Sequence, residues 1–210
     1  SPLVSAGVTS PMSAGGSVLE RFDLIVIGSG PAGRRAAIQA AKLGHSVLVS
    51  ENRLRVGGVS VHTGTIPSKT LRETVLNLSG WRERGFYGLA YRVKKDIEGK
   101  DLGARLRMTL DHEINVLEHQ FARNGVKTLA GRARFLDPHT LVVVNAEEET
   151  RITGDKIVIA VGTAPYRPAN IPFNDTSVFD SDNVATDPRV PRSLTVVGAG
   201  VIGLEYATIF

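Results

Sequence analysis

The sequence contains no cysteine among its 210 residues. This absence excludes a disulfide framework, zinc held by cysteine, iron–sulfur clusters and any thiol-based reaction in this chain. If the protein carries out redox chemistry, a bound cofactor must therefore hold the electrons.

Long apolar runs and concentrated charge are also missing. No stretch approaches the roughly 18 to 20 apolar residues that cross a bilayer, and the first residues lack the basic region and apolar core of a secretory signal. The 25 basic and 21 acidic residues are dispersed together, and only 6% of the residues are aromatic. We therefore expect no membrane anchor and no nucleic-acid interface.

The chain opens with a tail and then a βαβ pattern. Residues 1–20 are rich in Ser, Gly and Pro with almost no charge, which predicts a flexible tail. Residues 24–27 form a continuous apolar run, typical of a strand buried on both faces of a parallel sheet. An Ala-rich helix is expected to continue to about Leu43, and a second strand at residues 47–49 leads to Glu51.

The remaining pattern predicts a mixed α/β domain. After a Gly-rich loop, a helix is expected from Pro67 to about Leu78. Apolar residues recurring every three or four positions predict a helix over 101–124, and prolines punctuate residues 165–191. Strands are expected at 126–129, 141–144, 150–153, 156–161 and 194–197. Because a Rossmann unit needs a crossover helix and a returning strand, we expect this chain to be the N-terminal part of a longer protein.

A glycine-rich motif, GSGPAG at residues 28–33, stands between the first strand and the first helix. In such a motif Gly28 permits the tight turn, Gly30 lets a pyrophosphate approach the backbone, and Gly33 lets the helix press on the sheet. An acidic residue about 20 positions on, here Glu51, accepts hydrogen bonds from the adenosine ribose. This favours FAD or NAD over NADP, although nearby Arg53 and Arg55 could accommodate a 2′-phosphate.

A second motif, GAGVIG at residues 198–203, has the same setting of a strand before and a helix after. Its ribose-reading position would lie beyond Phe210. Two such motifs predict two dinucleotides in one enzyme, which is the arrangement for electron transfer between them.

The segment GGVSVHTGTIPSK at residues 57–69 resembles the active-site segment of the flavoprotein disulfide reductase family, in which two cysteines flank this loop. Residues 153–162 resemble the second FAD segment of that family, and residues 198–205 resemble its nicotinamide-binding start. The resemblance extends over residues 22–210. It implies a doubly wound, Rossmann-like FAD-binding domain with an inserted β-meander at 21–191, incomplete here, and the truncated start of an NAD(P)-binding domain at 192–210.

The resemblance also implies the site residues. Lys69 and Glu205 are expected to meet beside the reactive nitrogen of the flavin and to be catalytic. The residues expected to bind FAD are Gly28, Ser29, Gly30, Pro31, Ala32, Gly33, Glu51, Asn52, Arg53, Gly57, Gly58, Val59, Ser60, Thr63, Gly64, Ser68, Lys69, Ala133, Ala160, Val161 and Gly162. Those expected to bind the nicotinamide dinucleotide are Gly198, Gly200, Val201, Ile202 and Gly203.

The two cysteine positions of the family are occupied by Ser60 and Thr65, so a disulfide relay is impossible. Threonine in the context GTIPSK resembles the pyridine nucleotide transhydrogenase branch of the family, from which Ser60 departs. That branch implies a cytoplasmic, homo-oligomeric enzyme that passes a hydride from NADPH through FAD to NAD⁺. Two alternatives stay open, namely a dihydrolipoamide dehydrogenase-like reductase with substituted cysteines and an FAD-binding protein without turnover.

Histidines give weaker signals. His112 and His119 lie near acidic residues, but their order differs from metal-binding motifs and fits a solvated helix face, so no metal is expected. His62 lies in the flavin loop by resemblance, where a hydrogen-bonded structural role and a proton-transfer role are both open.

Overall fold

The computed structural model describes residues 20–80, 86, 88, 98–146, 148–186 and 190–210. The tail expected at 1–20 lies outside these residues, except that Glu20 belongs to the first strand. The strands are β1 (Glu20–Ile27), β2 (Val47–Glu51), β3 (Lys127–Ala130), β4 (Arg132–Phe135), β5 (Thr140–Val144) and β6 (Glu149–Ile159). The helices are α1 (Pro31–Lys42), α2 (Gly58–His62), α3 (Thr65–Ser79), α5 (Gly99–Arg123), α6 (Ser181–Thr186) and α7 (Val201–Ile209).

The strands form one sheet in the order β3-β2-β1-β6-β5-β4. The first four in this order are parallel, and β5 pairs antiparallel with both β4 and β6. Strand β1 lies between β2 and β6, with Ile25 opposite Leu48 on one side and Ile157 on the other. The predicted Rossmann-like α/β domain is confirmed.

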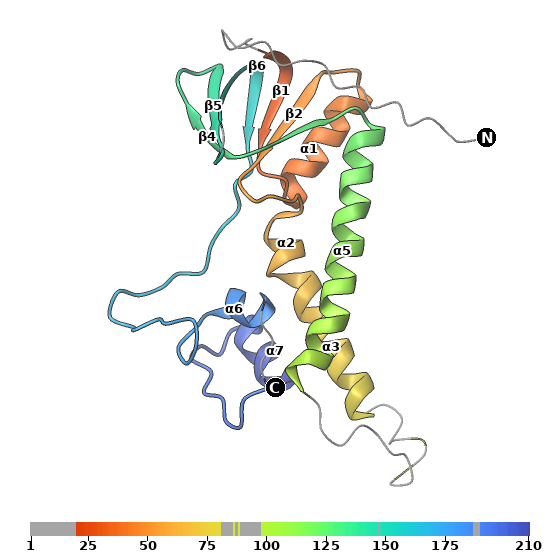
Figure 1. Cartoon of the computed structure of the whole chain (residues 1–210), viewed down its shortest axis with the longest axis vertical. Coiled ribbons are helices and arrows are strands. Elements are labelled where there is room, and N and C mark those ends of the chain that lie inside the picture. The colour runs from red at the N-terminus through yellow and green to blue at the C-terminus, as the bar shows by residue number, and fades with distance from the viewer. Residues whose placement is uncertain (1–19, 81–85, 87, 89–97, 147, 187–189) are drawn as a thin grey trace, which may run out of the picture.

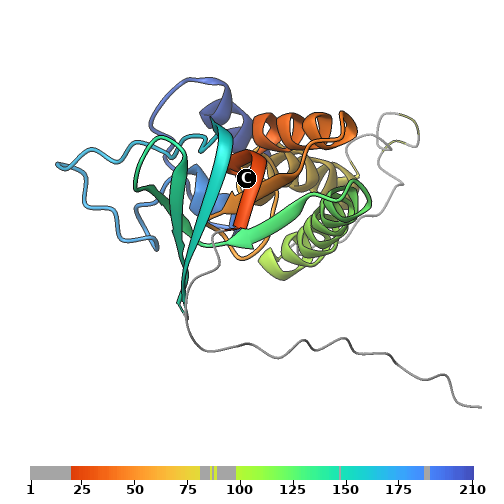
Figure 2. The ribbon, with the colours of Figure 1, turned by 90° about the horizontal axis from the view of Figure 1, so that it is seen from above.

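Both faces of β1 are covered, as the apolar run predicts. Val26 packs with residues of α1 and α5 on one face, whereas Ile25 packs with residues of β5 and β6 on the other, and both side chains are fully buried. Figure 2 shows α1 and α5 together on one side of the parallel strands, with β4 and β5 at the opposite edge. The inserted β-meander is therefore built from β4, β5 and the first half of β6.

Two strand predictions in the meander were wrong. Residues 150–153 and 156–161 are not separate strands, because β6 runs through both and ends at Ile159. Gly154 allows this continuity, since a Cβ there would lie 2.8 Å from Ile25 Cδ1 of the neighbouring strand. Strand β4 was missed because it is short and largely exposed, with arginines at two of its positions.

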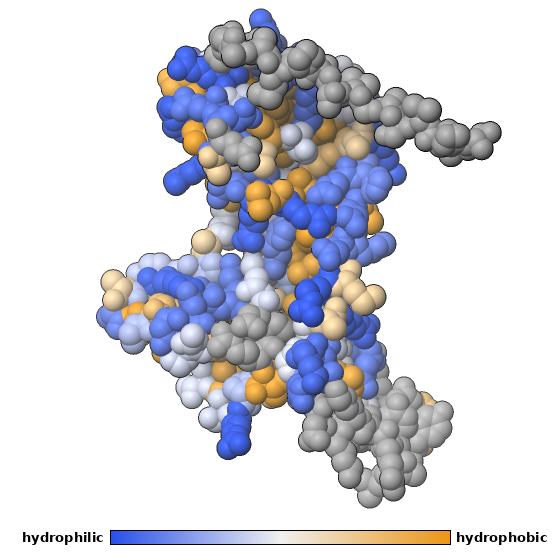
Figure 3. Space-filling view, in the orientation of Figure 1, coloured by the Kyte–Doolittle hydropathy of each residue, from blue (hydrophilic) through white to orange (hydrophobic). Residues whose placement is uncertain are grey.

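Helix α5 has the predicted amphipathic pattern. Its buried residues include Leu102, Leu106, Ile114, Leu117 and Phe121. The helix runs along the length of the molecule in Figure 1, from the end near α7 to the sheet, and its outward surface in Figure 3 is mainly hydrophilic. Among the described residues, no helix combines the length and apolar character needed to cross a membrane.

The segment expected to be a loop after β2 contains the short helix α2 and the first two residues of α3. Helix α2 is a short turn of helix over Gly58–His62, and α3 begins at Thr65 rather than at Pro67. Proline is tolerated there because the N–H groups of the first helical turn have no partner within the helix. The prediction was wrong by two residues for this reason.

The C-terminal segment differs from the sequence prediction in two ways. Helix α6 was missed, although the Asp180 side chain accepts hydrogen bonds from the N–H groups of Asp182 and Asn183 in the manner of an N-cap. Residues 194–197 do not form a strand, and Val197 is 95% exposed. No described strand lies beside this segment to accept its backbone hydrogen bonds, and a single strand is not stable alone.

Removal of the buried Phe121 side chain of α5 is expected to destabilise the domain. Phe121→Ala should lower the free energy of unfolding by about 3–5 kcal/mol, because a fully buried ring leaves a cavity. Met108→Ala on the same helix, where the side chain is 74% exposed, should change it by less than about 0.5 kcal/mol. Urea unfolding of the two variants checks this, and equal losses would contradict the core assignment.

Candidate functional site

The first glycine turn is formed by backbone packed too closely for side chains. A Cβ at Gly28 would lie 2.3 Å from the Ala160 carbonyl oxygen, and one at Gly33 would lie 1.9 Å from the Gly28 carbonyl oxygen. Gly28 also has a φ of 101°, which other residues rarely adopt. Helix α1 begins at Pro31 without a side-chain cap, so its first N–H groups are available to an anion.

Glu51 is nearly buried at the end of β2, beside this turn. Its Oε2 accepts hydrogen bonds from the Ser29 N–H at 2.9 Å and the Ser29 hydroxyl at 2.5 Å, and its Oε1 accepts one from the Arg53 N–H at 3.0 Å. This places an oriented carboxylate next to the N-terminus of α1, where a dinucleotide-binding fold needs its ribose contact.

The loop that opens α2 meets the glycine turn backbone to backbone. A Cβ at Gly58 would lie 2.7 Å from Gly30 Cα, and the Gly57 N–H donates to the Ser29 hydroxyl at 2.8 Å. The two glycine loops therefore form one narrow cradle without side chains, which suits a pyrophosphate.

Arg55 is engaged away from this cradle. Its guanidinium donates to Glu118, Asp111 and Asn115 of α5, and the hydrogen bond with Glu118 is the main cause of its raised pKa. The alternative in which Arg55 accommodates a 2′-phosphate is therefore disfavoured. The same bonds show that two acidic residues near His112 and His119 hold an arginine.

His62 lies against the backbone of the same segment. Its Nε2 is 3.2 Å from the Arg55 carbonyl oxygen and 3.1 Å from that of Val56. These contacts favour the structural role for His62.

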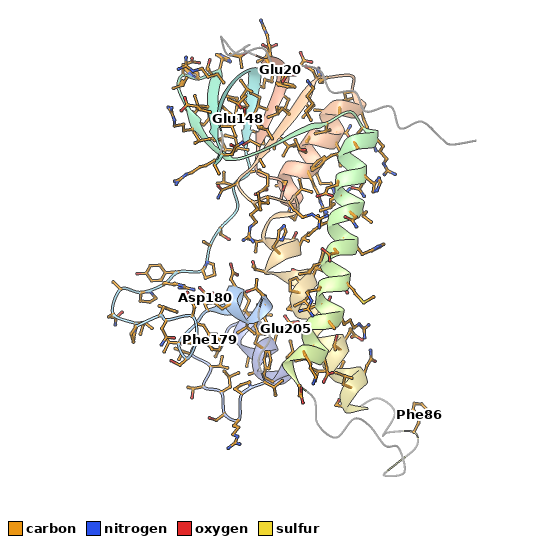
Figure 4. All side chains as sticks on the ribbon, in the orientation of Figure 1. Glu20, Phe86, Glu148, Phe179, Asp180 and Glu205 are labelled. Atoms are coloured by element: carbon orange, nitrogen blue, oxygen red, sulfur yellow. The ribbon has the colours of Figure 1, made fainter. Side chains whose placement is uncertain are left out.

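A cleft of about 700 Å³ lies between α2–α3 and α6–α7. The Lys69 Nζ atom of α3 lies 2.5 Å from Glu205 Oε1 of α7 inside it, and Figure 4 shows Glu205 on α7 beside α3. The contact implied by the family resemblance is thus present. The cleft is lined by Val59, Thr63, Gly64, Thr65, Ser68, Lys69, Thr163, Ala164, Pro165, Ser181, Asp182, Val201, Ile202, Glu205 and Tyr206.

Two buried hydroxyls in the walls of the cleft lack partners. Among the described residues, the buried side-chain polar atoms without a hydrogen bond are Thr63 Oγ1 and Tyr206 Oη. Burial, with smaller effects from Glu205 and Asp182, raises the pKa of Tyr206 to about 12. Unsatisfied buried groups are uncommon, and both of these belong to residues that line the cleft. Tyr206 was missed because the apolar pattern of its helix predicts only a core residue.

The two positions that hold cysteine in the family, Ser60 and Thr65, lie in different helices. Ser60 lies within α2 and its hydroxyl donates to the Gly57 carbonyl at 3.3 Å, whereas Thr65 is the first residue of α3 and lines the cleft. Neither position holds a sulfur atom.

The second glycine motif has the same local shape as the first. Gly198 has a φ of 113°, and a Cβ at Gly203 would lie 2.2 Å from the Gly198 carbonyl oxygen. Gly200 precedes α7 as Gly30 precedes α1, again without a side-chain cap. Helix α7 therefore also presents free N–H groups, and Val201 and Ile202 line the cleft.

The candidate site residues fall into two groups. One group, at the carboxyl end of β1 and β2, consists of the glycine turn, residues 51–53 and the 57–58 loop. The other group lies in the cleft with α7 and consists of Val59, Thr63, Gly64, Ser68 and Lys69, whereas Ser60 does not line the cleft. Ala133 belongs to neither group by its side chain, which packs with the buried core beside β1. Val161 and Gly162 follow β6 and lead into the cleft residues 163–165.

A parallel sheet with a glycine turn at the carboxyl end of its central strand, and an acidic residue at the end of the next strand, defines a Rossmann-like dinucleotide-binding protein. The sequence profile of the pyridine nucleotide-disulphide oxidoreductase family matches residues 22–210, and the chain belongs to that family.

Relatives and solved structures agree with this family assignment. The chain is 49% identical over 194 residues to the soluble pyridine nucleotide transhydrogenase of Mycobacterium bovis and 37% identical over 204 residues to that of Chromohalobacter salexigens. Each match covers 91% of this chain and 42% of the relative, so the chain spans about two fifths of these proteins. The copper(II) complex of the HOCl-induced flavoprotein disulfide reductase RclA from Escherichia coli matches with a TM-score of 0.76 at 26% identity, over 91% of this chain and 40% of that one.

The close contact between the Gly28–Gly30 turn and the 57–58 loop can be tested by a pair of substitutions. Gly58 and Gly125 have similar φ values of 62° and 69°, but only Gly58 has a neighbour within 4 Å of its ideal Cβ. Gly125→Ala should cost about 1–2 kcal/mol of unfolding free energy for the left-handed conformation. Gly58→Ala should cost at least about 1 kcal/mol more, because its methyl group meets Gly30. Equal costs in urea unfolding would argue against the cradle.

Proposed function

We propose that the chain is part of an FAD-dependent pyridine nucleotide transhydrogenase that passes a hydride from NADPH through the flavin to NAD⁺. The observation that carries this proposal is the Lys69–Glu205 pair, held in the cleft between α2–α3 and α6–α7 in a chain without cysteine. The names of the relatives point to the same activity.

The residues present fit FAD. The backbones of Gly28, Gly30 and Gly58 leave no space for side chains between them, the free α1 N-terminus favours phosphates, and the Glu51 carboxylate beside it would accept hydrogen bonds from the ribose. Thr63, whose buried hydroxyl lacks a partner, lines the cleft in which the flavin end would lie. When bound there, FAD would accept the hydride from one nicotinamide and return it to the other.

The protein side chains would act by positioning and electrostatics. The Lys69 ammonium would stabilise the negative charge that builds up as a hydride arrives, which lowers the barrier more than it stabilises the ground state. Glu205 would orient that ammonium by the contact already present. The free N–H groups of α7 would receive the pyrophosphate of the nicotinamide dinucleotide.

Domain organisation and setting form part of the proposal. Residues 21–191 would belong to the FAD-binding domain and residues 192–210 would open the NAD(P)-binding domain. The full-length protein would work in the cytoplasm as a homodimer or larger homo-oligomer, without nucleic acid or membrane partners. Because Ser60 and Thr65 cannot form a relay, activity as a disulfide reductase is the less favoured alternative.

An assay of the full-length protein tests the function. We expect yellow protein with bound FAD, reduction of an NAD⁺ analogue by NADPH, and no turnover of lipoamide or glutathione disulfide. Ser60→Cys should leave the rate within a few-fold of the original, because a single thiol completes no relay. Lipoamide reduction by the unmodified protein would reject the proposal.

Lys69→Met should slow flavin reduction by NADPH at least about tenfold, or ~1.4 kcal/mol of barrier, while FAD stays bound. Lys127→Met is the matched control, because Lys127 is equally exposed and also pairs with a glutamate, Glu20, but lies at β3 away from the cleft. Stopped-flow reduction measures both variants. If Lys69→Met and the unmodified protein reduce flavin at equal rates, Lys69 has no role in the reaction.

A further inference from the structure

Ser29 lies at the centre of a buried hydrogen-bonded cluster. Its side chain has no exposed surface. Its hydroxyl donates to Glu51 Oε2 at 2.5 Å and accepts from the Gly57 N–H at 2.8 Å, and its own N–H donates to the same Oε2 at 2.9 Å. The donor of this hydroxyl and one of its two acceptor sites are therefore used within the protein, and because the side chain is fully buried it is not placed to contact a ligand.

The cluster determines which oxygen of Glu51 is available. A carboxylate offers about four lone-pair sites, two on each oxygen. Both sites on Oε2 are taken by Ser29, whereas Oε1 accepts only the Arg53 N–H among the described hydrogen bonds. One site on Oε1 is left for a hydroxyl donor from outside the protein.

The same hydroxyl also holds the loop that leads to the flavin end of the site. Gly57 precedes α2, and a φ of 128° at this residue starts the turn. Its N–H is satisfied by Ser29, and the next residue, Gly58, contacts Gly30. Helix α2 then leads to Thr63 and, through α3, to Lys69.

We propose that Ser29 is a positioning residue, whose hydroxyl orients Glu51 for the ribose of the dinucleotide and fixes the start of α2 at the same time. The inference rests on the proposed function, since FAD is the ligand that Glu51 would bind. It changes the role expected for Ser29 from cofactor contact to support of two separate parts of the site. Removing the hydroxyl leaves the Gly57 N–H unpaired and takes away one of the three hydrogen bonds that orient the Glu51 carboxylate, although no ligand contact is lost.

The test measures FAD dissociation from full-length protein carrying Ser29→Ala. The dissociation constant should rise at least about tenfold, because a hydrogen bond to a buried charged group is lost. Ser50→Ala is the matched control, since Ser50 is equally buried on the adjoining strand but its hydroxyl makes only a 3.4 Å contact with the Gly131 carbonyl. The control should stay within about twofold of the original protein.

A double-mutant cycle with Glu51→Ala separates positioning from general destabilisation. If Ser29 acts through Glu51, Ser29→Ala should weaken FAD binding clearly less in the Glu51→Ala protein than in the original protein, and the part that remains reports the lost contact with the Gly57 N–H. A purely structural effect would instead multiply with that of Glu51→Ala. Ser29→Cys, which keeps the volume but donates weakly, provides a second variant should the alanine protein fail to fold, and it too should weaken FAD binding.

Three outcomes would overturn the inference. The first is that Ser29→Ala or Ser29→Cys binds FAD as tightly as the original protein does. The second is that Ser29→Ala weakens FAD binding by the same factor whether residue 51 is glutamate or alanine. In both cases the proposed function survives if Glu51→Ala weakens FAD. An original protein that binds no FAD would overturn the proposed function and this inference with it.

Discussion

The contact between Gly33 and the Gly28 carbonyl is the constraint on which the rest of the site depends. It brings α1 against the sheet so closely that Ala37 and Val26 are fully buried together. With α1 seated there, the turn between β1 and α1 has glycine at two of its three residues, and no side chain caps the helix. The adjoining elements, Glu51 on β2 and the 57–58 loop, then meet that turn through hydrogen bonds and backbone contact.

The cleft around Lys69 and Glu205 depends on a separate hydrophobic cluster. Leu71 of α3 and Leu102 and Leu106 of α5 pack against Tyr206 and Ile209 of α7. Glu205 precedes Tyr206, so burial of the tyrosine brings the carboxylate to Lys69. The ion pair joins residues 136 positions apart, and the apolar contacts rather than the charges bring the two helices together.

The sequence predicts the β1–α1–β2 unit well because two independent signals coincide there. The apolar run predicts a buried strand that ends before Gly28, and the glycine motif predicts the turn that starts there. The acidic residue after β2 then indicates where the ribose of a dinucleotide would lie. Tertiary pairing decides the parts that were missed. Strand β4 exists because β5 lies beside it, and residues 194–197 lack a described partner. The Ser29 cluster was also out of reach, because the motif specifies where the serine lies but not which groups its hydroxyl bonds.

The Lys69–Glu205 pair contributes little to the stability of the fold. The Lys69 side chain is 60% exposed and that of Glu205 only 18%, so the carboxylate is held by the protein while the ammonium reaches it from solvent. An exposed pair of this kind stabilises a protein by about 0–1 kcal/mol. In a partly water-excluded site with an effective dielectric near 20, charges about 4 Å apart interact by roughly 4 kcal/mol before desolvation is subtracted. Ligands that fill the cleft would exclude water from Lys69, so the attraction would become strong only when both dinucleotides are in place. The geometry therefore favours a role in the proposed reaction over a role in folding.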